Sequence, residues 1–292
     1  MILSASYRTD IPAFYAAWFL NRFRAGRVRV KNPYGGQPIE LALRDGVDGY
    51  VFWTRNIGPF QDALGALCQA GLPFVVQYTV TGYPRALETA IGDPARSIAL
   101  IHELAQRHGR RSVVWRYDPI LITDLTPPDW HRQNFAVLAR GLEGATDEVV
   151  ISFAQLYRKT LRNLNLAAHA HGFRWHNPEP APKRALARDL AAIARDHGMV
   201  LTLCTQPDLI AADLPAARCI DRERLSDQAG RMITARTKGN RPGCLCAESR
   251  DIGDYDSCPH GCVYCYAVSS RETAKARLQA HDPAGEGLIP AL

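Results

Sequence analysis

The amino-acid sequence predicts an α/β fold built on a parallel sheet. Six short apolar runs, rich in β-branched and aromatic residues, recur along the first 205 residues, as is typical of buried parallel strands. Segments with apolar residues at helical spacing lie between these runs, and no low-complexity stretch interrupts the alternation. Six βα units in succession favour a sheet that is either doubly wound or curved into a partial (β/α)6 TIM-type barrel.

The expected elements follow one another along the chain. Strands are predicted at residues 1–6, 49–54, 74–79, 112–117, 148–153 and 199–205. Helical spacing of apolar residues marks three of the intervening helices, with stripes at Ile98, Ile101 and Leu104, at Phe135, Leu138 and Leu142, and at Leu186, Leu190 and Ile193. Glycines such as Gly109 and Gly198 suit helix C-caps. A last helix is expected near residues 263–280.

The composition fits one structural domain with two parts. The chain has 292 residues, 47% of them hydrophobic, which is enough to bury a large core. After residue 205 glycine, aspartate and cysteine become dense. We therefore expect residues 1–205 to form the barrel. Residues 206–292 are expected to form a cysteine-rich, cluster-binding segment with a C-terminal helix packed on the barrel.

Charge and hydropathy argue against several classes of function. The net charge of +6 is mild and the 35 basic residues are spread along the chain, so a nucleic-acid partner is not indicated. No apolar run reaches the roughly 18 residues of a membrane span. The first residues lack the basic and long apolar regions of a secretory signal. We therefore expect a cytoplasmic protein without a membrane partner.

Cysteine usage predicts metal binding. Seven of the eight cysteines fall in the last third of the chain, and five of them lie within 22 residues. In a reducing compartment such a concentration favours a metal site over a disulfide framework. Cys258, Cys262 and Cys265 form a C-x3-C-x2-C motif, whose thiolates can hold three irons of a [4Fe-4S] cluster and leave the fourth iron open. A zinc knuckle or ribbon is the alternative, and it would need a fourth ligand.

A second group of cysteines can saturate another metal centre. Its members are Cys204, Cys219, Cys244 and Cys246. Four thiolates suit an auxiliary [4Fe-4S] cluster or a zinc ion. In the alternative interpretation the first two are core residues and only the C-x-C pair binds anything.

Polar residues at the ends of the predicted strands are candidates for binding and catalysis, because ligands of such folds gather at the carboxyl ends of strands. We expect catalytic roles at Arg8, Asp10, Arg116 and Asp118. We expect cofactor contacts at Thr54, Asn56, Thr79, Tyr264 and Tyr266. Two simpler interpretations stay open: Asp10 caps a helix, and the Arg116–Asp118 pair only stabilises the rim.

The pattern C-x3-C-x-aromatic-C resembles the signature of radical S-adenosylmethionine enzymes. The resemblance implies a partial (β/α)6 barrel and a site-differentiated [4Fe-4S] cluster whose open iron binds S-adenosylmethionine. It also implies reductive cleavage to a 5′-deoxyadenosyl radical, with an electron donor such as a flavodoxin or ferredoxin. Two features differ from that superfamily: the motif usually follows the first strand but here follows the sixth, and the usual Gly-Gly-Glu after the second strand is absent.

The chain as a whole resembles an uncharacterised bacterial family of unknown function with the same C-terminal motif. The matching pieces are SASYRTDIP at 4–12, FWTRN at 52–56, WRYDP at 115–119 and DIGDYDSCPHGCVYCYA at 251–267. We therefore expect a radical S-adenosylmethionine enzyme that acts on an unidentified substrate. The rival hypotheses are a zinc-binding protein that contacts nucleic acid and an iron–sulfur protein that transfers electrons without radical chemistry.

Overall fold

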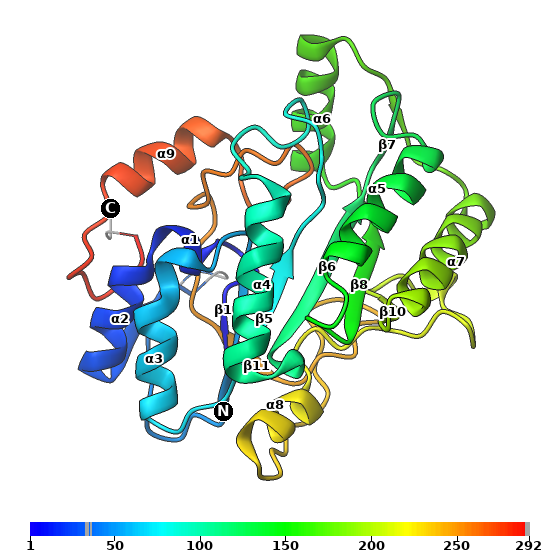
Figure 1. Ribbon diagram of the computed structural model, residues 1–292. Helices are drawn as coiled ribbons and strands as arrows, with labels where there is room; N and C mark the ends of the chain where they lie inside the picture. The colour runs from blue at the N-terminus through cyan, green and yellow to red at the C-terminus, as the bar shows by residue number, and fades with distance from the viewer. Residues whose placement is uncertain (33–34, 36, 290–292) are drawn as a thin grey trace.

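The computed structural model describes residues 1–32, 35 and 37–289. Within these residues, seven strands form one parallel sheet in the order β10-β8-β6-β5-β4-β1-β11 (Figure 1). All six predicted strands are confirmed. They are β1 (Ile2–Ala5), β4 (Gly49–Thr54), β5 (Phe74–Thr79), β6 (Val113–Ile120), β8 (Glu148–Phe153) and β10 (Val200–Leu203). The short strand β11 (Ser249–Asp251) was not predicted.

The order of the strands in the sheet follows their order in the sequence, and the sheet is open. From β1 to β10 each strand of the sheet lies beside the next one in sequence, and β11 is added on the free side of β1. Strands β10 and β11 are therefore its edges, and the strands of the described residues form no closed barrel. In the part of the chain that the structure describes, two small antiparallel pairs lie outside this sheet. They are β2 (Arg27–Val30) with β3 (Ile39–Ala42), and β7 (Ile122–Thr123) with β9 (Trp175–His176).

The helices alternate with the strands, as expected for βα units. They are α1 (Ile11–Phe14), α2 (Ala16–Ala25), α3 (Gln61–Gln69), α4 (Pro94–His108), α5 (Pro128–Gly141), α6 (Arg158–His171), α7 (Pro180–Asp196), α8 (Arg222–Ala229) and α9 (Arg271–Gln279). The three predicted apolar stripes lie on α4, α5 and α7. The last residue of the second stripe, Leu142, directly follows α5. Short 3-10 turns occupy Gly58–Phe60, Arg110–Ser112 and Pro207–Leu209.

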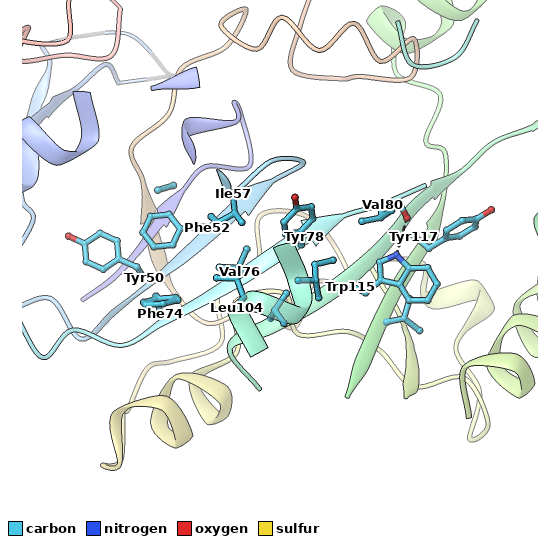
Figure 2. Close-up of a cluster of buried hydrophobic side chains, with 14 of the residues drawn as sticks. Tyr50, Phe52, Ile57, Phe74, Val76, Tyr78, Val80, Leu104, Trp115 and Tyr117 are labelled. Atoms are coloured by element: carbon cyan, nitrogen blue, oxygen red, sulfur yellow. Dashed lines mark hydrogen bonds between the residues drawn. The ribbon is translucent and has the colours of Figure 1, made fainter. Parts of the chain in front are cut away.

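One face of the sheet carries the main hydrophobic core. Side chains alternate along each strand, so Tyr50 and Phe52 point to this face while Val51 points away from it. Figure 2 shows these aromatic rings beside Tyr78 and Trp115, together with Leu104 from α4. Helices α2, α3, α4, α5 and α7 contribute to the same core.

The opposite face is covered by the chain that follows β10. Its strand residues are mostly small and aliphatic: Ile2, Val51, Val75, Val114 and Val150. They pack against Cys204, Ala217, Cys219, Ile220, Leu225, Ile233, Cys246 and Ala247. Helix α8 thus packs on this face rather than with the other helices, and residues 204–247 occupy the surface that would face inward in a closed barrel.

The last predicted helix is shorter than expected. Helix α9 begins at Arg271, where Ser270 caps it by accepting a hydrogen bond from the backbone N–H of Thr273. Residues 263–269 belong instead to an irregular loop. Their backbone groups bond to other parts of the chain, as in the bonds from Val263 N to Leu87 O and from Thr160 Oγ1 to Tyr264 O. The final residues return to the body, where Leu288 is buried; positions 290–292 of the predicted segment 206–292 lie outside the described residues. Among the helices described, none combines the length and apolar character that crossing a bilayer requires.

Candidate functional site

The three cysteines of the C-x3-C-x2-C motif lie in a loop that crosses the carboxyl ends of the parallel strands. We define the cysteine loop as residues 256–268. It hydrogen-bonds to segments that follow four different strands. The bonds are Tyr15 Oη to Ser257 O (2.6 Å), Ala90 N to His260 O (3.0 Å), Val263 N to Leu87 O (3.1 Å), Thr160 Oγ1 to Tyr264 O (3.2 Å) and Tyr266 Oη to Tyr7 O (2.5 Å), and His260 contacts Asp10. The segments after β1, β5 and β8 therefore hold the loop, and Arg55 after β4 joins them through Tyr264.

The strand order explains how a late motif reaches this edge. β11 pairs in parallel with β1, with Ile2 opposite Ser249 and Ser4 opposite Asp251. The loop that follows β11 therefore begins at the same edge as the loop that follows β1. In space the cysteine motif follows a neighbour of the first strand, although in sequence it comes after the sixth.

A glycine allows the turn between the first two cysteines. Gly261 has φ +76°, a left-handed conformation that residues with a Cβ rarely adopt. A Cβ at this position would also lie 2.8 Å from Arg271 Cδ. The C-x3-C spacing thus contains one position that favours glycine for both conformational and steric reasons.

The three thiols are partly buried and lie close enough to influence one another. Burial raises the pKa of Cys258, and the charges of Asp10, Cys265 and Cys262 raise it further. Burial also raises the pKa of Cys262 to about 12 and raises that of Cys265, while Arg55 acts in the opposite direction on both. Without a bound cation these thiols stay protonated at neutral pH, so a metal would have to displace their protons.

The three sulfur atoms do not surround a single point. Among residues 1–32, 35 and 37–289, no three His, Cys, Asp or Glu side chains are arranged so that they could hold one metal ion. In a four-iron cluster each thiolate binds a different iron, so the thiols of such a site do not have to converge.

Asp10 connects the cysteine loop to the end of β1. One carboxylate oxygen lies 2.8 Å from His260 Nε2 and accepts a hydrogen bond from Arg55 N at 2.8 Å. The other accepts from Thr54 Oγ1 at 2.7 Å and from Ala13 N at 2.9 Å, which caps α1. Asp10 and Thr54, predicted as separate site residues, are thus brought into contact, and the helix-cap interpretation of Asp10 applies.

An ion pair beside the cysteine loop had not been predicted. Arg55 Nη2 lies 2.8 Å from Glu88 Oε1; Glu88 is buried, and the Arg55 side chain is 9% exposed. Glu88 also accepts hydrogen bonds from Thr81 Oγ1 at 2.7 Å and from the hydroxyl of Tyr264, which bonds to Arg55 as well. Tyr264, a predicted cofactor contact, is therefore held by charged partners. Glu88 belongs to no motif and lies in a loop, so the sequence offered no signal for its role.

Asp251 is the second buried acid that the sequence did not single out. It accepts hydrogen bonds from Ser4 Oγ at 2.9 Å, Ser6 Oγ at 2.8 Å, Tyr7 N at 3.0 Å and Gly253 N at 2.9 Å. These bonds fasten β11 to the residues that follow β1. Burial raises the pKa of Asp251, and the nearby Arg8 guanidinium opposes this shift.

Arg8 lies at the edge of the same region. Its Nη1 donates to Gly253 O at 3.3 Å, its Nε lies 3.7 Å from Asp251 Oδ1, and its guanidinium is 5.3 Å from the Tyr255 ring centre. The Nε atom is buried without a hydrogen-bond partner. Arg8, a predicted catalytic residue, thus lies beside the start of the cysteine loop. Its Nε–H is available to donate a hydrogen bond.

The other candidate pair contacts the second group of cysteines. Arg116 bonds to Asp118, as expected, but its Nη1 donates to Gln77 Oε1 at 3.1 Å and to Cys219 Sγ at 3.0 Å. Arg116 and Asp118 thus lie with the second group of cysteines on the sheet face opposite the main core. Asp118 also accepts a hydrogen bond from Ser152.

The remaining predicted cofactor contacts are scattered. Asn56 Oδ1 accepts from Gly58 N at 3.1 Å and shapes the turn after β4. Thr79 ends β5 opposite Arg116 and is partly exposed. Tyr266 is 41% exposed, and its ring centre lies 6.1 Å from that of Tyr157. Only Tyr266 among these three lies in the cysteine loop.

The second group of cysteines is assembled by the fold. Cys204, Cys219 and Cys246 are buried, while Cys244 is partly exposed. Cys219 Sγ lies 3.6 Å from Cys204 Sγ. A hydrogen bond with Cys246 lowers the pKa of Cys244 to about 6. Cys204 and Cys219 are core residues, as the alternative interpretation expects, and they lie in the same cluster as the C-x-C pair.

Comparison with known protein families gives one match. A family model described as a domain of unknown function (DUF1848) matches residues 2–267. The chain belongs to the DUF1848 family. The match covers the whole sheet and all eight cysteines of this DUF1848 protein and leaves α9 outside. The predicted membership of an uncharacterised family is thus confirmed. No match was found among curated proteins or among solved structures.

Proposed function

We propose that this DUF1848 protein is a radical S-adenosylmethionine enzyme with a partial (β/α)6 barrel. Cys258, Cys262 and Cys265 would hold a [4Fe-4S] cluster, and S-adenosylmethionine would bind at the iron that they leave open. The observation that carries the proposal is the position of the cysteine loop, which follows β11 beside β1 and crosses the carboxyl ends of the strands. Parallel α/β folds bind their ligands at this edge.

The residues around the loop fit a polar, charged cofactor. Among the described residues, six buried side-chain atoms lack a hydrogen-bond partner, and three of them are Arg8 Nε, Thr9 Oγ1 and His260 Nδ1. Buried polar groups are normally satisfied, so their concentration beside the cysteine loop supports a missing polar ligand. The donor set also fits, because three thiols suit three irons of a cluster.

When bound, the cluster would supply the electron for reductive cleavage of S-adenosylmethionine. The chain would contribute three effects. The loop partly buries the thiols, which would limit the access of water to the cluster. The Arg55 charge favours thiolates at Cys262 and Cys265. The bonds of Glu88 to Arg55 and to Tyr264 keep the loop fixed over the strand ends. The partner would be a one-electron donor of the flavodoxin or ferredoxin class, and the substrate is unidentified.

One observation favours a second candidate, a structural zinc site. His260 directs Nε2 at Asp10, and its Nδ1 is buried without a partner. A carboxylate–histidine pair of this kind often orients a metal ligand. Together with three cysteines, His260 would complete a Cys3His zinc site.

Metal analysis distinguishes the two candidates. The wild-type protein and a Cys258→Ala/Cys262→Ala/Cys265→Ala variant are purified and reconstituted without oxygen, and iron and zinc are measured in both. The proposal predicts that the variant loses about four irons per chain and no zinc. It also predicts that S-adenosylmethionine changes the electron paramagnetic resonance spectrum of the reduced wild-type cluster. Loss of about one zinc without loss of iron would establish the zinc site instead.

A further inference from the structure

Four cysteines form a row of sulfur atoms on the sheet face opposite the main core. Cys219 Sγ lies 3.6 Å from Cys204 Sγ. Cys246 belongs to the same buried cluster, and Cys244 packs against it. The four residues come from three separate segments: the end of β10, the turn before α8, and the C-x-C pair before β11. The fold therefore gathers side chains that the sequence keeps apart.

A buried cation lies against the same row. Arg116, 4% exposed, directs Nη1 at Cys219 Sγ at 3.0 Å and lies 4.8 Å from the Trp53 ring centre. A buried guanidinium is stable only with anionic partners and satisfied donors. Asp118 supplies one carboxylate. A metal-bound thiolate at Cys219 would supply a second anionic acceptor, and Arg116 would offset the negative charge of a four-thiolate centre.

Packing alone does not account for this arrangement. Nearer the amino ends of the strands the same face is filled by aliphatic side chains such as Val51, Val75 and Val114. Aliphatic residues at the four cysteine positions would fill space equally well. A disulfide does not account for it either, because the 3.6 Å between the Sγ atoms of Cys204 and Cys219 is far longer than the S–S bond of about 2.0 Å.

We propose that Cys204, Cys219, Cys244 and Cys246 hold a second metal centre whose positions are all taken by protein thiolates. Four thiolates select zinc or the iron of an iron–sulfur cluster. In a tetrahedral zinc site with bonds of about 2.3 Å, neighbouring sulfurs are about 3.8 Å apart, close to the distance between Cys204 and Cys219. A cluster would spread the row further, because each thiolate then binds its own iron.

The row has to close for the metal to bind, since the sulfur atoms described do not yet surround one point. Cys244 is the least buried of the four and follows Gly243, which has φ +76°, so a shift of Cys244 would be the movement that closes the row. With no position open for substrate, the centre would fasten residues 204–247 to the sheet. This inference does not depend on the chemistry proposed for the cysteine loop.

The test uses the full-length variant that lacks the three loop cysteines, so that any remaining metal belongs to the second centre. After anaerobic reconstitution with iron and sulfide, or with zinc, we expect about one zinc or about four irons per chain. Adding Cys219→Ser and Cys246→Ser should remove this metal, whereas Cys68→Ser, at an exposed cysteine, should leave it in place. A folded triple variant that holds neither metal would overturn the proposal.

A second measurement covers the case in which the variants do not fold. The wild-type protein is alkylated with iodoacetamide before and after a chelator is added, and the labelled cysteines are located by mass spectrometry. Cys244 is informative because it is partly exposed without metal. The proposal predicts at least tenfold slower alkylation of Cys244 before chelation than after it. Equal rates would contradict the proposal.

Discussion

His260 Nε2 lies 2.8 Å from Asp10 Oδ2, although 250 residues separate the two in sequence. The contact joins the cysteine loop to the turn after the first strand. It is buried, and the same carboxylate holds Thr54, Arg55 and the start of α1. Asp10 is therefore a positioning residue for the loop, and no chemistry has to be assigned to it.

The first prediction concerns this contact. His260→Ala removes a hydrogen bond to a carboxylate, which contributes about 1.5–3 kcal/mol. We expect faster amide hydrogen exchange in residues 256–268 and unchanged exchange in α4 and α5. Hydrogen exchange with mass spectrometry measures both. His171→Ala, at an exposed position, is the control. Unchanged protection of the cysteine loop in His260→Ala would show that the contact does not hold it.

The second prediction concerns the Arg55–Glu88 pair. Glu88→Gln leaves the buried guanidinium without its carboxylate partner, and breaking a buried pair costs about 3–5 kcal/mol. The midpoint of urea denaturation should fall accordingly. The double variant Arg55→Met/Glu88→Gln should regain part of the loss, because the buried charge is gone. If the double variant loses as much stability, relative to the wild type, as Arg55→Met and Glu88→Gln lose together, the two residues are not coupled.

The third prediction compares two glycines. A Cβ at Gly253 would lie 2.0 Å from Ser6 Oγ, whereas a Cβ at Gly65, exposed in α3, meets nothing within 4 Å. Gly253→Ala should displace Ser6 from Asp251 and destabilise the protein by about 1–3 kcal/mol. Gly65→Ala should stabilise it by about 0.5–1 kcal/mol. Thermal denaturation measures both, and effects of equal sign would refute the predicted contrast.

The fourth prediction concerns pH. Burial lowers the pKa of His131 to about 4, and the ring lies between Tyr117 Oη at 2.8 Å and Leu121 O at 3.1 Å. The unfolded chain binds the proton first as the pH falls below about 6.5. Stability is therefore lost between about pH 6.5 and pH 4, by up to ~3 kcal/mol in total. His131→Gln should flatten this part of the pH profile relative to the wild type. Parallel profiles would show that His131 does not contribute.

The sequence predicted the strands that are buried on both faces of the sheet. Strands such as β4 and β5 are continuous apolar runs that have few other stable conformations. Strand β11 could not be predicted in this way. Its sequence, Ser-Arg-Asp, has no apolar pattern, and it is a strand because it pairs with β1 and because Asp251 binds the residues after β1.

Only those parts of the candidate site that have a local sequence pattern were predicted. The spacing of the cysteines indicated the cysteine loop and the second group, because closely spaced cysteines in such a chain are typical of metal sites. The burial of Glu88 and Asp251 depends on contacts between distant segments, which leave no local pattern. The Arg116–Asp118 pair was expected at the carboxyl edge, but only the path of residues 204–247 decides that Cys219 lies beside it.

The most direct test of the central proposal is the formation of 5′-deoxyadenosine. The reconstituted wild-type protein is incubated without oxygen with S-adenosylmethionine and dithionite, and the product is quantified by liquid chromatography with mass spectrometry. Cys262→Ala, checked for native secondary structure by circular dichroism, is the matched control. The proposal predicts 5′-deoxyadenosine from the wild type and only the protein-free background from Cys262→Ala. Background levels from wild-type protein that carries its loop iron would contradict it.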